Sequence, residues 1–398
     1  MAFDFDTVID RRGSGSMKWD CRERVLLEKD VIPMWVADMD FPAPPAVVEV
    51  IRKRAEHAIY GYPLASASLL DSVVRWLRLR HRFDVRREWL SRCPGVVPSL
   101  SLCVNAFTKP GDGIVIQTPV YHPFYHVINN NGRRLIRNPL KLGASPDRFE
   151  MDFADLERKI DARTRMIILC SPHNPVGRVW TGDELARLGE ICAARDLIIV
   201  SDEIHAEIVF KGHDHRPLAG ISADLAGRTV TLHAPSKTFN IAGLNTSFAV
   251  IPNPELKGLF DAQIRSGGLN MGNIFGLIAM EAAYERGADW LDALLVYLEG
   301  NLDVLDRFLA ERIPRIKIVR PQGTFLALLD CRPLMMEQKA LNEFFLRKAK
   351  VFFNEGPLFG EEIHGFVRLN FGCPRSLLTE ALERMERAVN SLEIHGGT

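Results

Sequence analysis

The sequence lacks the features that would direct it to a membrane or to nucleic acid. Its 50 basic and 50 acidic side chains give a formal net charge of zero, so no global electrostatic attraction to nucleic acid or anionic lipid is expected. No uninterrupted apolar run approaches the length of about 18 residues that a membrane-spanning helix needs. We therefore expect neither a nucleic-acid partner nor a membrane partner.

Cysteine is also sparse, and its spacing suggests no framework. The seven cysteines form no CxxC pair and are odd in number, which predicts neither a disulfide scaffold nor a zinc site. The stretch Met1–Asp6 is acidic and lacks the basic-then-apolar order of a signal peptide. These absences predict a cytoplasmic protein without a metal ion.

The 398 residues are enough for two domains with large cores. From residue 46 to about residue 280, helical stretches alternate with short strands, which predicts an α/β fold with a doubly wound, mainly parallel sheet. Residues 1–45 are irregular and end in a proline-rich stop. Two long amphipathic helices are expected near residues 286–312, followed by a mixture of strands and helices up to residue 398.

Three short apolar runs of the middle region are each followed by a polar side chain. The runs at 165–170, 197–201 and 229–232 are typical of parallel strands that are covered on both faces. In chain order, the side chains that follow them are Asn174, Asp202 and Lys237. Because open α/β folds place their chemistry at the carboxyl ends of strands, these side chains are candidates for one site.

Each of the three suits a different atom of the aldehyde cofactor pyridoxal phosphate (PLP). The amine of Lys237 can form a Schiff base with the aldehyde. The carboxylate of Asp202 can pair with a protonated pyridine nitrogen and keep the ring an electron sink. The amide of Asn174 can donate to the phenolic oxygen. The alternatives are a solvated lysine, a buried structural aspartate and an Asx-turn before a proline.

Five motifs follow one another along the chain. They are Met34–Phe41 (MWVADMDF), Tyr60–Tyr62 (YGY), Pro172–Gly177 (PHNPVG), Ser201–His205 (SDEIH) and Ser236–Asn240 (SKTFN). In this order they resemble the fold-type I PLP enzymes of the class I/II aminotransferase superfamily, and within it the MalY/PatB type of cystathionine β-lyase (C–S lyase). The resemblance extends from residues 3–6 to residues 365–372.

The resemblance implies a fold and an assembly. A large PLP-binding domain would comprise residues 46–285, and a smaller α+β domain would combine residues 1–45 with residues 286–398. Tyr62 matches the tyrosine that reaches the cofactor phosphate from the other subunit. The protein would therefore be a homodimer with shared active sites.

The resemblance also implies roles around the cofactor ring. Lys237 would hold the cofactor and then remove the Cα proton of the substrate. Asp202 would face the pyridine nitrogen and Asn174 the phenolic oxygen. Tyr121 would stack on the ring, the alternative being a tyrosine packed in the core.

The phosphate is expected at a turn that precedes a helical stretch, since a helix N-terminus with free N–H groups is a natural phosphate seat. Ser99 and Leu100 would contribute backbone amides there, and Ser236 would contribute its hydroxyl. For Ser99, simple helix capping is the alternative.

The substrate side depends on residues from both ends of the chain. Arg368 matches the arginine that grips an α-carboxylate through two parallel hydrogen bonds, the alternative being a structural ion pair. Trp35 and Ala37 lie where the N-terminal loop of the family lines the substrate pocket. An amino acid is the substrate that these residues imply.

Four positions depart from patterns of the family. Typical aminotransferases of this fold have a tyrosine three residues after the pyridine-pairing aspartate and an arginine eight residues after the lysine. This chain has His205 at the first of these positions, where it would lie beside the cofactor, and Asn245 at the second. Both departures resemble the C–S lyase branch. Ala234 and Leu328 stand where that branch often has serine and tryptophan, and the second leaves the substrate open.

The reaction implied is α,β-elimination from L-cystathionine or another L-cysteine S-conjugate, with pyruvate, ammonia and a thiol as products. The nearest alternative is a PLP-dependent aminotransferase of an L-amino acid. A non-enzymatic regulator that uses the fold to bind a partner is a further alternative. The complete set of Lys237, Asp202, Asn174 and Arg368 favours an enzyme.

Overall fold

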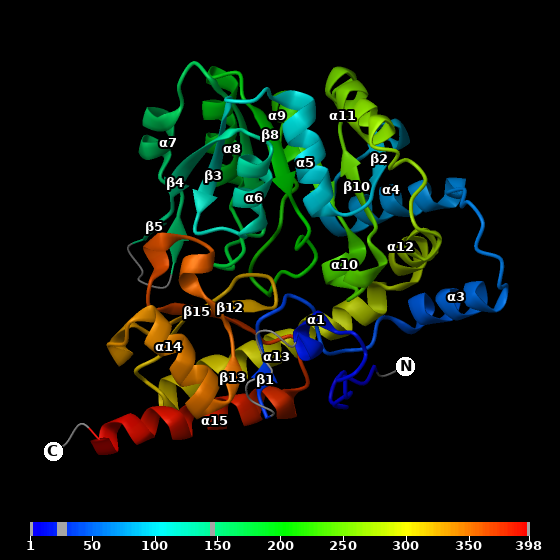
Figure 1. Cartoon of the computed structure of the whole chain (residues 1–398). Helices are drawn as coiled ribbons and strands as arrows, with labels where there is room; N and C mark the ends of the chain where they lie inside the picture. Colours follow the sequence, from blue (N-terminus) through cyan, green and yellow to red (C-terminus); the bar gives the residue numbers. More distant parts are fainter. Residues whose placement is uncertain (1–2, 22–29, 144–147, 396–398) are drawn as a thin grey trace.

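Seven strands form the central sheet, in the order β2-β10-β9-β8-β7-β3-β4 (Figure 1). In chain order they are β2 (Leu90–Cys93), β3 (Gly113–Thr118), β4 (Arg134–Pro139), β7 (Thr164–Cys170), β8 (Ile198–Asp202), β9 (Thr229–His233) and β10 (Ser247–Val250). This computed structural model describes residues 3–21, 30–143 and 148–395. Pairing is parallel from β9 to β4, whereas β10 is antiparallel to β9 and to β2. The predicted mainly parallel sheet is therefore confirmed, with an antiparallel edge.

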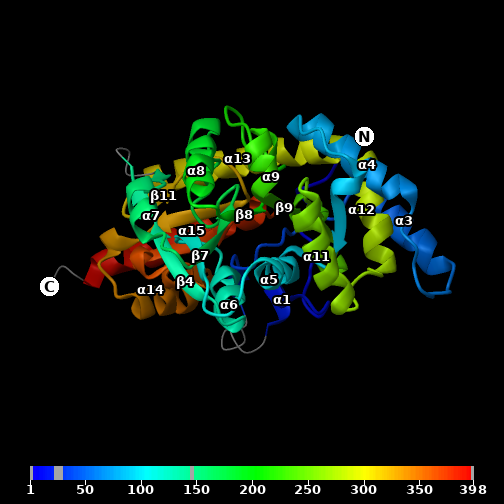
Figure 2. The ribbon, with the colours of Figure 1, turned by 90° about the horizontal axis from the view of Figure 1, so that it is seen from above.

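The central strands are apolar because helices cover both faces of the sheet (Figure 2). In β7, Met166 and Ile168 pack into one core, and Ile167 and Leu169 pack into the other. The first core is closed by α5 (Val96–Phe107), α6 (Pro123–Asn130) and α11 (Pro254–Ser266), and the second by α7 (Phe153–Lys159), α8 (Gly182–Ala194) and α9 (Ala223–Arg228). Because successive side chains of a strand point to opposite faces of the sheet, this strand contributes side chains to both cores.

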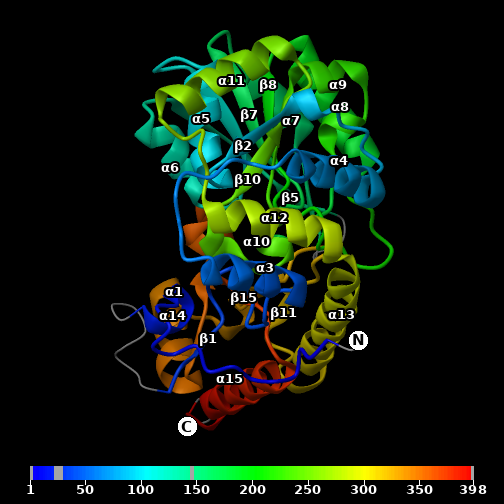
Figure 3. The same ribbon diagram turned by 90° about the vertical axis from the view of Figure 1, so that its right-hand side faces the viewer.

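A smaller antiparallel sheet lies below the central one in Figures 1 and 3. Its strands, in spatial order, are β11 (Lys317–Val319), β12 (Leu326–Asp330), β15 (Phe366–Asn370) and β14 (Asn354–Glu355). Beside it, β1 (Ile32–Pro33) pairs in parallel with β13 (Val351–Phe352). The N-terminal segment is thereby attached to the C-terminal part of the chain, while the boundaries at residues 45 and 285 stay predictions.

The helices near residue 300 differ from the prediction. Instead of two helices, a single helix of 25 residues, α13 (Ala288–Arg312), follows α12 (Ile274–Arg286). Buried leucines recur at spacings of three or four through Gly300, from Leu291 to Leu309. This continuous apolar face outweighs the cost of about 1 kcal/mol for a glycine inside a helix.

The remaining helices lie at the outside of the two sheets. They are α1 (Met17–Asp20), α3 (Pro45–Glu56), α4 (Ala67–His81), α14 (Gln338–Phe344) and α15 (Arg375–His395). A short ribbon pairs β5 (Lys141–Leu142) with β6 (Phe149–Glu150). In the described part of the chain, no helix combines the length and the apolarity that a membrane span requires.

Candidate active site

A cavity of about 270 Å³ opens at the carboxyl ends of the parallel strands. Of the residues predicted for a site, it is lined by Ala37, Tyr121, Asn174, Asp202, His205, Ser236 and Lys237. These residues come from the N-terminal loop and from the segments after β3, β7, β8 and β9. The fold thus gathers side chains at one sheet edge that lie up to 200 residues apart in the sequence.

Lys237 stands on α10 (Pro235–Thr238), which begins two residues after β9 ends. Its Nζ donates to the carbonyl oxygen of Ala37 at 2.6 Å. Burial lowers the pKa of Lys237 to about 8, because an apolar environment disfavours the ammonium ion. The amine is therefore neutral, and nucleophilic, in a larger fraction of molecules near neutral pH than an exposed lysine would be.

Asp202 ends β8 and is 3% exposed. Its Oδ1 accepts a hydrogen bond from the Ile204 N–H at 3.2 Å, and no cationic side chain of the described residues forms an ion pair with it. Burial raises the pKa of Asp202 to about 7. A buried carboxylate that faces a cavity without a counter-charge fits a cationic ligand atom, such as a protonated pyridine nitrogen.

Arg368 lies in β15 and is 4% exposed. It donates to Asn174 Oδ1 at 2.9 Å, to the Trp35 carbonyl at 2.8 Å and to Asn354 Oδ1 at 2.7 Å. All three acceptors are neutral, its Nε has no partner, and no carboxylate within residues 3–21, 30–143 or 148–395 pairs with it. Burial lowers the pKa of Arg368 to about 10. A buried cation without a counter-ion is costly, so this position fits an anionic ligand.

Tyr121 and His205 contribute neutral rings to the cavity wall. Burial raises the pKa of Tyr121 and lowers that of His205 to about 3. The His205 ring packs edge-on against Phe325, with the ring centroids 5.9 Å apart. Its Nδ1 is buried without a partner in the described structure, so this imidazole can still form a hydrogen bond to a ligand.

The predicted phosphate amides need correction. Helix α5 starts at Val96, after Gly95, whose φ of 142° favours glycine. The Ser99 N–H already donates to the Gly95 carbonyl oxygen at 3.1 Å, and its hydroxyl donates to the same oxygen. Neither Ser99 nor Leu100 is among the residues that line the cavity, whereas Val96 and Val97 are. The first amides of a helix lack intrahelical acceptors, and in α5 these are the N–H groups of Val96 and Val97.

Four other positions singled out in the sequence, among them Arg368, lie outside the cavity wall. Tyr62, between α3 and α4, is 91% exposed. Trp35 is buried, its indole N–H donates to the Lys18 carbonyl at 3.2 Å, and its own carbonyl oxygen accepts from Arg368 at 2.8 Å. Leu328 is fully buried in β12, where it pairs in register with Arg368. By contrast, Ala234 and Asn245 both line the cavity.

Asn240 is a positioning residue that the sequence interpretation missed. Its Nδ2 donates to the carbonyl oxygens of Met39 (2.9 Å) and Phe41 (2.7 Å), and its Oδ1 accepts from the Met39 N–H (3.0 Å). These bonds fasten the N-terminal loop to the segment that carries Lys237, which brings Ala37 to the lysine. Its place in the SKTFN motif was the only signal in the sequence.

The donor set of the cavity therefore fits PLP. It offers a lysine amine, a buried carboxylate, an amide, an aromatic ring and a helix N-terminus beside the Ser236 hydroxyl. The buried guanidinium of Arg368 donates a hydrogen bond to the amide oxygen of Asn174.

The family described as aminotransferase class I and II matches residues 29–385. The chain is 42% identical to cystathionine beta-lyase PatB of Bacillus subtilis (strain 168), over 97% of this chain and 100% of the relative. It is 32% identical to protein MalY of Escherichia coli (strain K12), over 98% and 100%. Among solved structures, cystalysin from Treponema denticola, which contains PLP, superposes with a TM-score of 0.94 at 37% identity, over 98% and 100%. The PLP-bound C–S lyase from Staphylococcus hominis gives 0.90 at 31% identity, over 98% of each chain.

Proposed function

This chain belongs to the aminotransferase class I and II family, and we propose that it is a PLP-dependent carbon–sulfur β-lyase. Its substrates would be L-cystathionine or other L-cysteine S-conjugates, which it would convert to pyruvate, ammonia and a thiol. The observation that carries the proposal is the buried, uncompensated charge of Arg368 beside a lysine–aspartate cavity. The 42% identity to PatB over nearly the whole chain supports it.

The residues of the cavity would hold the cofactor at several points. Lys237 would hold it through its amine, with Asp202 facing the pyridine nitrogen and Asn174 the phenolic oxygen. Tyr121 would stack on the ring. The phosphate would lie at the Val96 and Val97 amides and the Ser236 hydroxyl. When bound, PLP supplies an electron sink that stabilises negative charge at the Cα of an amino acid.

The substrate would be oriented by Arg368 and deprotonated by Lys237. The guanidinium would receive the α-carboxylate through two parallel hydrogen bonds, which fixes one end of the amino acid. The amine of Lys237, with its pKa near 8, would take the Cα proton as a general base. Asp202 would keep its negative charge opposite the pyridine nitrogen throughout.

Product analysis distinguishes this lyase from an aminotransferase. L-cystathionine and a panel of S-alkyl cysteines are incubated with the enzyme, with and without a keto acid. Pyruvate and free thiol in the absence of the keto acid support the lyase, and their rates rank the leaving groups. A new amino acid that forms only when the keto acid is present, with no pyruvate, would identify an aminotransferase.

We also propose that the enzyme is a homodimer in which Tyr62 completes the active site of the partner. The segment between α3 and α4 exposes four large apolar side chains: Ile59 (68%), Tyr60 (56%), Tyr62 (91%) and Leu64 (94%). Exposed apolar groups this close together are typical of an interaction surface. In Figure 1 the segment that connects α3 to α4 lies at the right-hand edge of the molecule.

Mixed dimers test the sharing of active sites. Lys237→Ala and Tyr62→Ala are each expected to be nearly inactive alone. Unfolding and refolding them together in equal amounts should restore about a quarter of the wild-type sites, because each mixed dimer has one intact site. No gain over the separate variants would contradict shared sites.

For the cellular compartment we propose the cytoplasm. All seven cysteines are unpaired, which is typical of a reducing environment. Labelling of the denatured protein, extracted under conditions that trap thiols, should give seven thiols per chain.

A further inference from the structure

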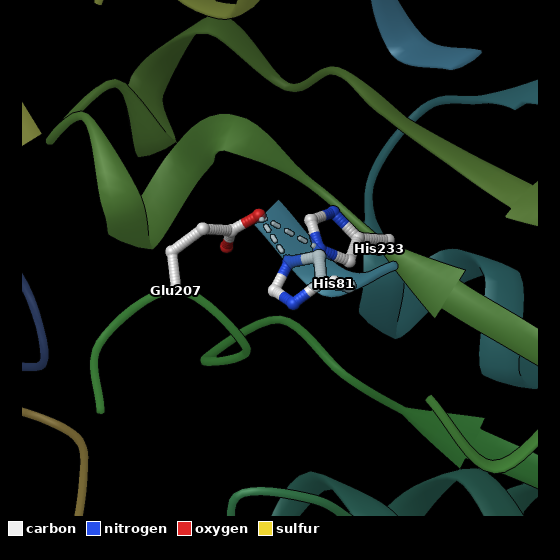
Figure 4. A group of neighbouring side chains, drawn as sticks. All are labelled: His81, Glu207 and His233. Atoms are coloured by element: carbon white, nitrogen blue, oxygen red, sulfur yellow. Dashed lines mark hydrogen bonds and ion pairs between the residues drawn. The ribbon is translucent and has the colours of Figure 1, made fainter. Parts of the chain in front are cut away.

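Three titratable side chains meet in the interior, away from the PLP cavity. Figure 4 shows His81 at the end of α4, Glu207 in the turn after β8 and His233 at the end of β9. Their side chains are 4%, 1% and 1% exposed. One ligand atom from each lies within 4.8 Å of the other two. None of the three lines the PLP cavity, so the proposed reaction does not use them.

The distances from the glutamate oxygen to the two histidine nitrogens match those between neighbouring ligands of a tetrahedral metal ion. His81 Nε2 is 3.2 Å and His233 Nε2 is 3.1 Å from Glu207 Oε1. Zinc binds imidazole nitrogen and carboxylate oxygen at about 2.0–2.2 Å, so two neighbouring ligands of a tetrahedral zinc ion lie about 3.3 Å apart. Two histidines and one glutamate are also a ligand set of zinc sites that keep one position open.

The His233 ring gives an independent indication of a ligand. Its Nε2 is buried and, despite the short distance to Glu207, has no hydrogen-bond partner of acceptable direction in the described structure. On the other side of the ring, Nδ1 lies 3.3 Å from the Tyr284 hydroxyl. In the tautomer in which Nδ1–H donates to the Tyr284 oxygen, Nε2 carries the lone pair that binds a metal, an arrangement common among metal-binding histidines.

The carboxylate of Glu207 is held by its neighbours. The Trp76 indole N–H donates to Oε1 at 2.8 Å, and the Thr238 hydroxyl donates to Oε2 at 2.8 Å. Bonds of this kind fix the orientation of a metal-binding carboxylate. They also connect the cluster to the residue that follows Lys237.

A second cavity, of about 170 Å³, lies against two of the three cluster residues. His81 and Glu207 form part of its wall, together with Arg80, His213 and His215. The guanidinium of Arg80 is paired with Asp292 at 2.6 Å, so its charge is compensated. The cavity gives an ion a path to the cluster and leaves room for a water molecule as the fourth ligand.

From these observations we propose that His81, Glu207 and His233 bind one divalent transition-metal ion of the zinc type, with the second cavity at its open position. The ion would connect α4, the turn after β8 and the end of β9 behind the PLP cavity. This site is separate from the proposed reaction and does not depend on it.

The test measures Zn²⁺ binding to the PLP-bound enzyme by equilibrium dialysis followed by elemental analysis. We expect one Zn²⁺ per chain in the wild type and at least tenfold weaker binding in Glu207→Gln, which keeps an acceptor oxygen for Trp76. His81→Gln should weaken binding in the same way, and it provides the test if Glu207→Gln does not fold. The matched control is His213→Ala, which removes an exposed histidine from the same cavity and should bind like the wild type.

Two further measurements distinguish binding at this site from binding to other histidines. Zn²⁺ should raise the melting temperature of the wild type and of His213→Ala but not that of Glu207→Gln, and Co²⁺ should give the visible spectrum of a tetrahedral site. Retained cofactor absorbance confirms that each variant has folded around PLP. Absence of stoichiometric Zn²⁺ from the wild type, or equal binding by wild type and Glu207→Gln, would overturn the proposal and leave a network of buried ion pairs.

Discussion

Asp202 and Glu203 are adjacent in sequence and almost equally buried, at 3% and 1% exposure, yet their surroundings differ. Asp202 faces the PLP cavity and accepts one backbone hydrogen bond. Glu203 accepts from the Ser201 hydroxyl (2.8 Å) and the Leu218 N–H (3.1 Å), and it pairs with His215 (3.0 Å). Burial raises the pKa of Asp202 to about 7. Burial also acts to raise the pKa of Glu203, but His215 and the other donors hold it below its ordinary value.

Two buried arginines show the same contrast. Arg178 is 2% exposed, and its Nη2 bonds to both carboxylate oxygens of Glu184 at 2.6 Å. Arg368 is 4% exposed and meets only neutral acceptors. A buried charge with a counter-charge maintains the structure, whereas one without a counter-charge indicates where a charged ligand belongs.

The largest effect is expected for Lys237→Ala. Loss of the general base should reduce pyruvate release by about 10²–10⁴-fold, and the visible absorbance of the lysine-bound cofactor should disappear. Lys257→Ala, on the outer helix α11, is the control and should behave as the wild type. A variant at Lys237 that retains both the absorbance and the activity would remove this residue from the site.

Glu203→Gln tests the buried carboxylate that has a charged partner. The amide cannot replace the carboxylate that pairs with His215, so we expect the free energy of unfolding to fall by about 3 kcal/mol, as for a broken buried ion pair. Chemical denaturation of the PLP-bound enzyme measures this loss. Unchanged stability would mean that the pairing around Glu203 contributes little to the fold.

A smaller effect is expected in the pH dependence of cofactor binding. Only neutral Lys237 can attack the aldehyde, and its pKa of about 8 is below the value of about 10.4 for an ordinary lysine. After removal of PLP, the rate of its reincorporation should rise about tenfold from pH 7 to pH 9 and then level off. N-acetyl-lysine methyl ester, measured in parallel, corrects for titration of PLP itself. A rate that still rises about sevenfold between pH 9 and pH 10 would indicate an unperturbed lysine.

The sequence was sufficient for the features that are encoded locally. Asn174, Asp202 and Lys237 follow short apolar runs, and strand ends of a parallel sheet meet at one edge, so their proximity could be predicted. The start of α5 could not be placed to the residue, because the helix begins at Val96, directly after Gly95 and before the serine that looked like its cap. The N–H groups that lack intrahelical acceptors therefore lie earlier in the chain than the serine.

Tertiary contacts account for what the sequence could not indicate. Arg368 could be assigned only by resemblance, and its lack of a counter-charge is visible only in the folded chain. His81 and Glu207 are 126 residues apart, and nothing in their local sequences links them. The single long helix α13 depends on an apolar face that continues through Gly300, which normally interrupts helices.

The most direct test of the central claim is kcat/KM for pyruvate release by Arg368→Met, measured together with its free energy of unfolding. Removal of two charge-assisted hydrogen bonds, each about 1.5 kcal/mol, should lower kcat/KM at least about 10²-fold through KM. Stability should stay within about 1 kcal/mol of the wild type, since the loss of an unpaired buried charge offsets the lost hydrogen bonds. Arg178→Met, which breaks a buried ion pair, should instead lose stability. An unchanged KM, or a destabilisation of Arg368→Met as large as that of Arg178→Met, would contradict a substrate-binding role for Arg368.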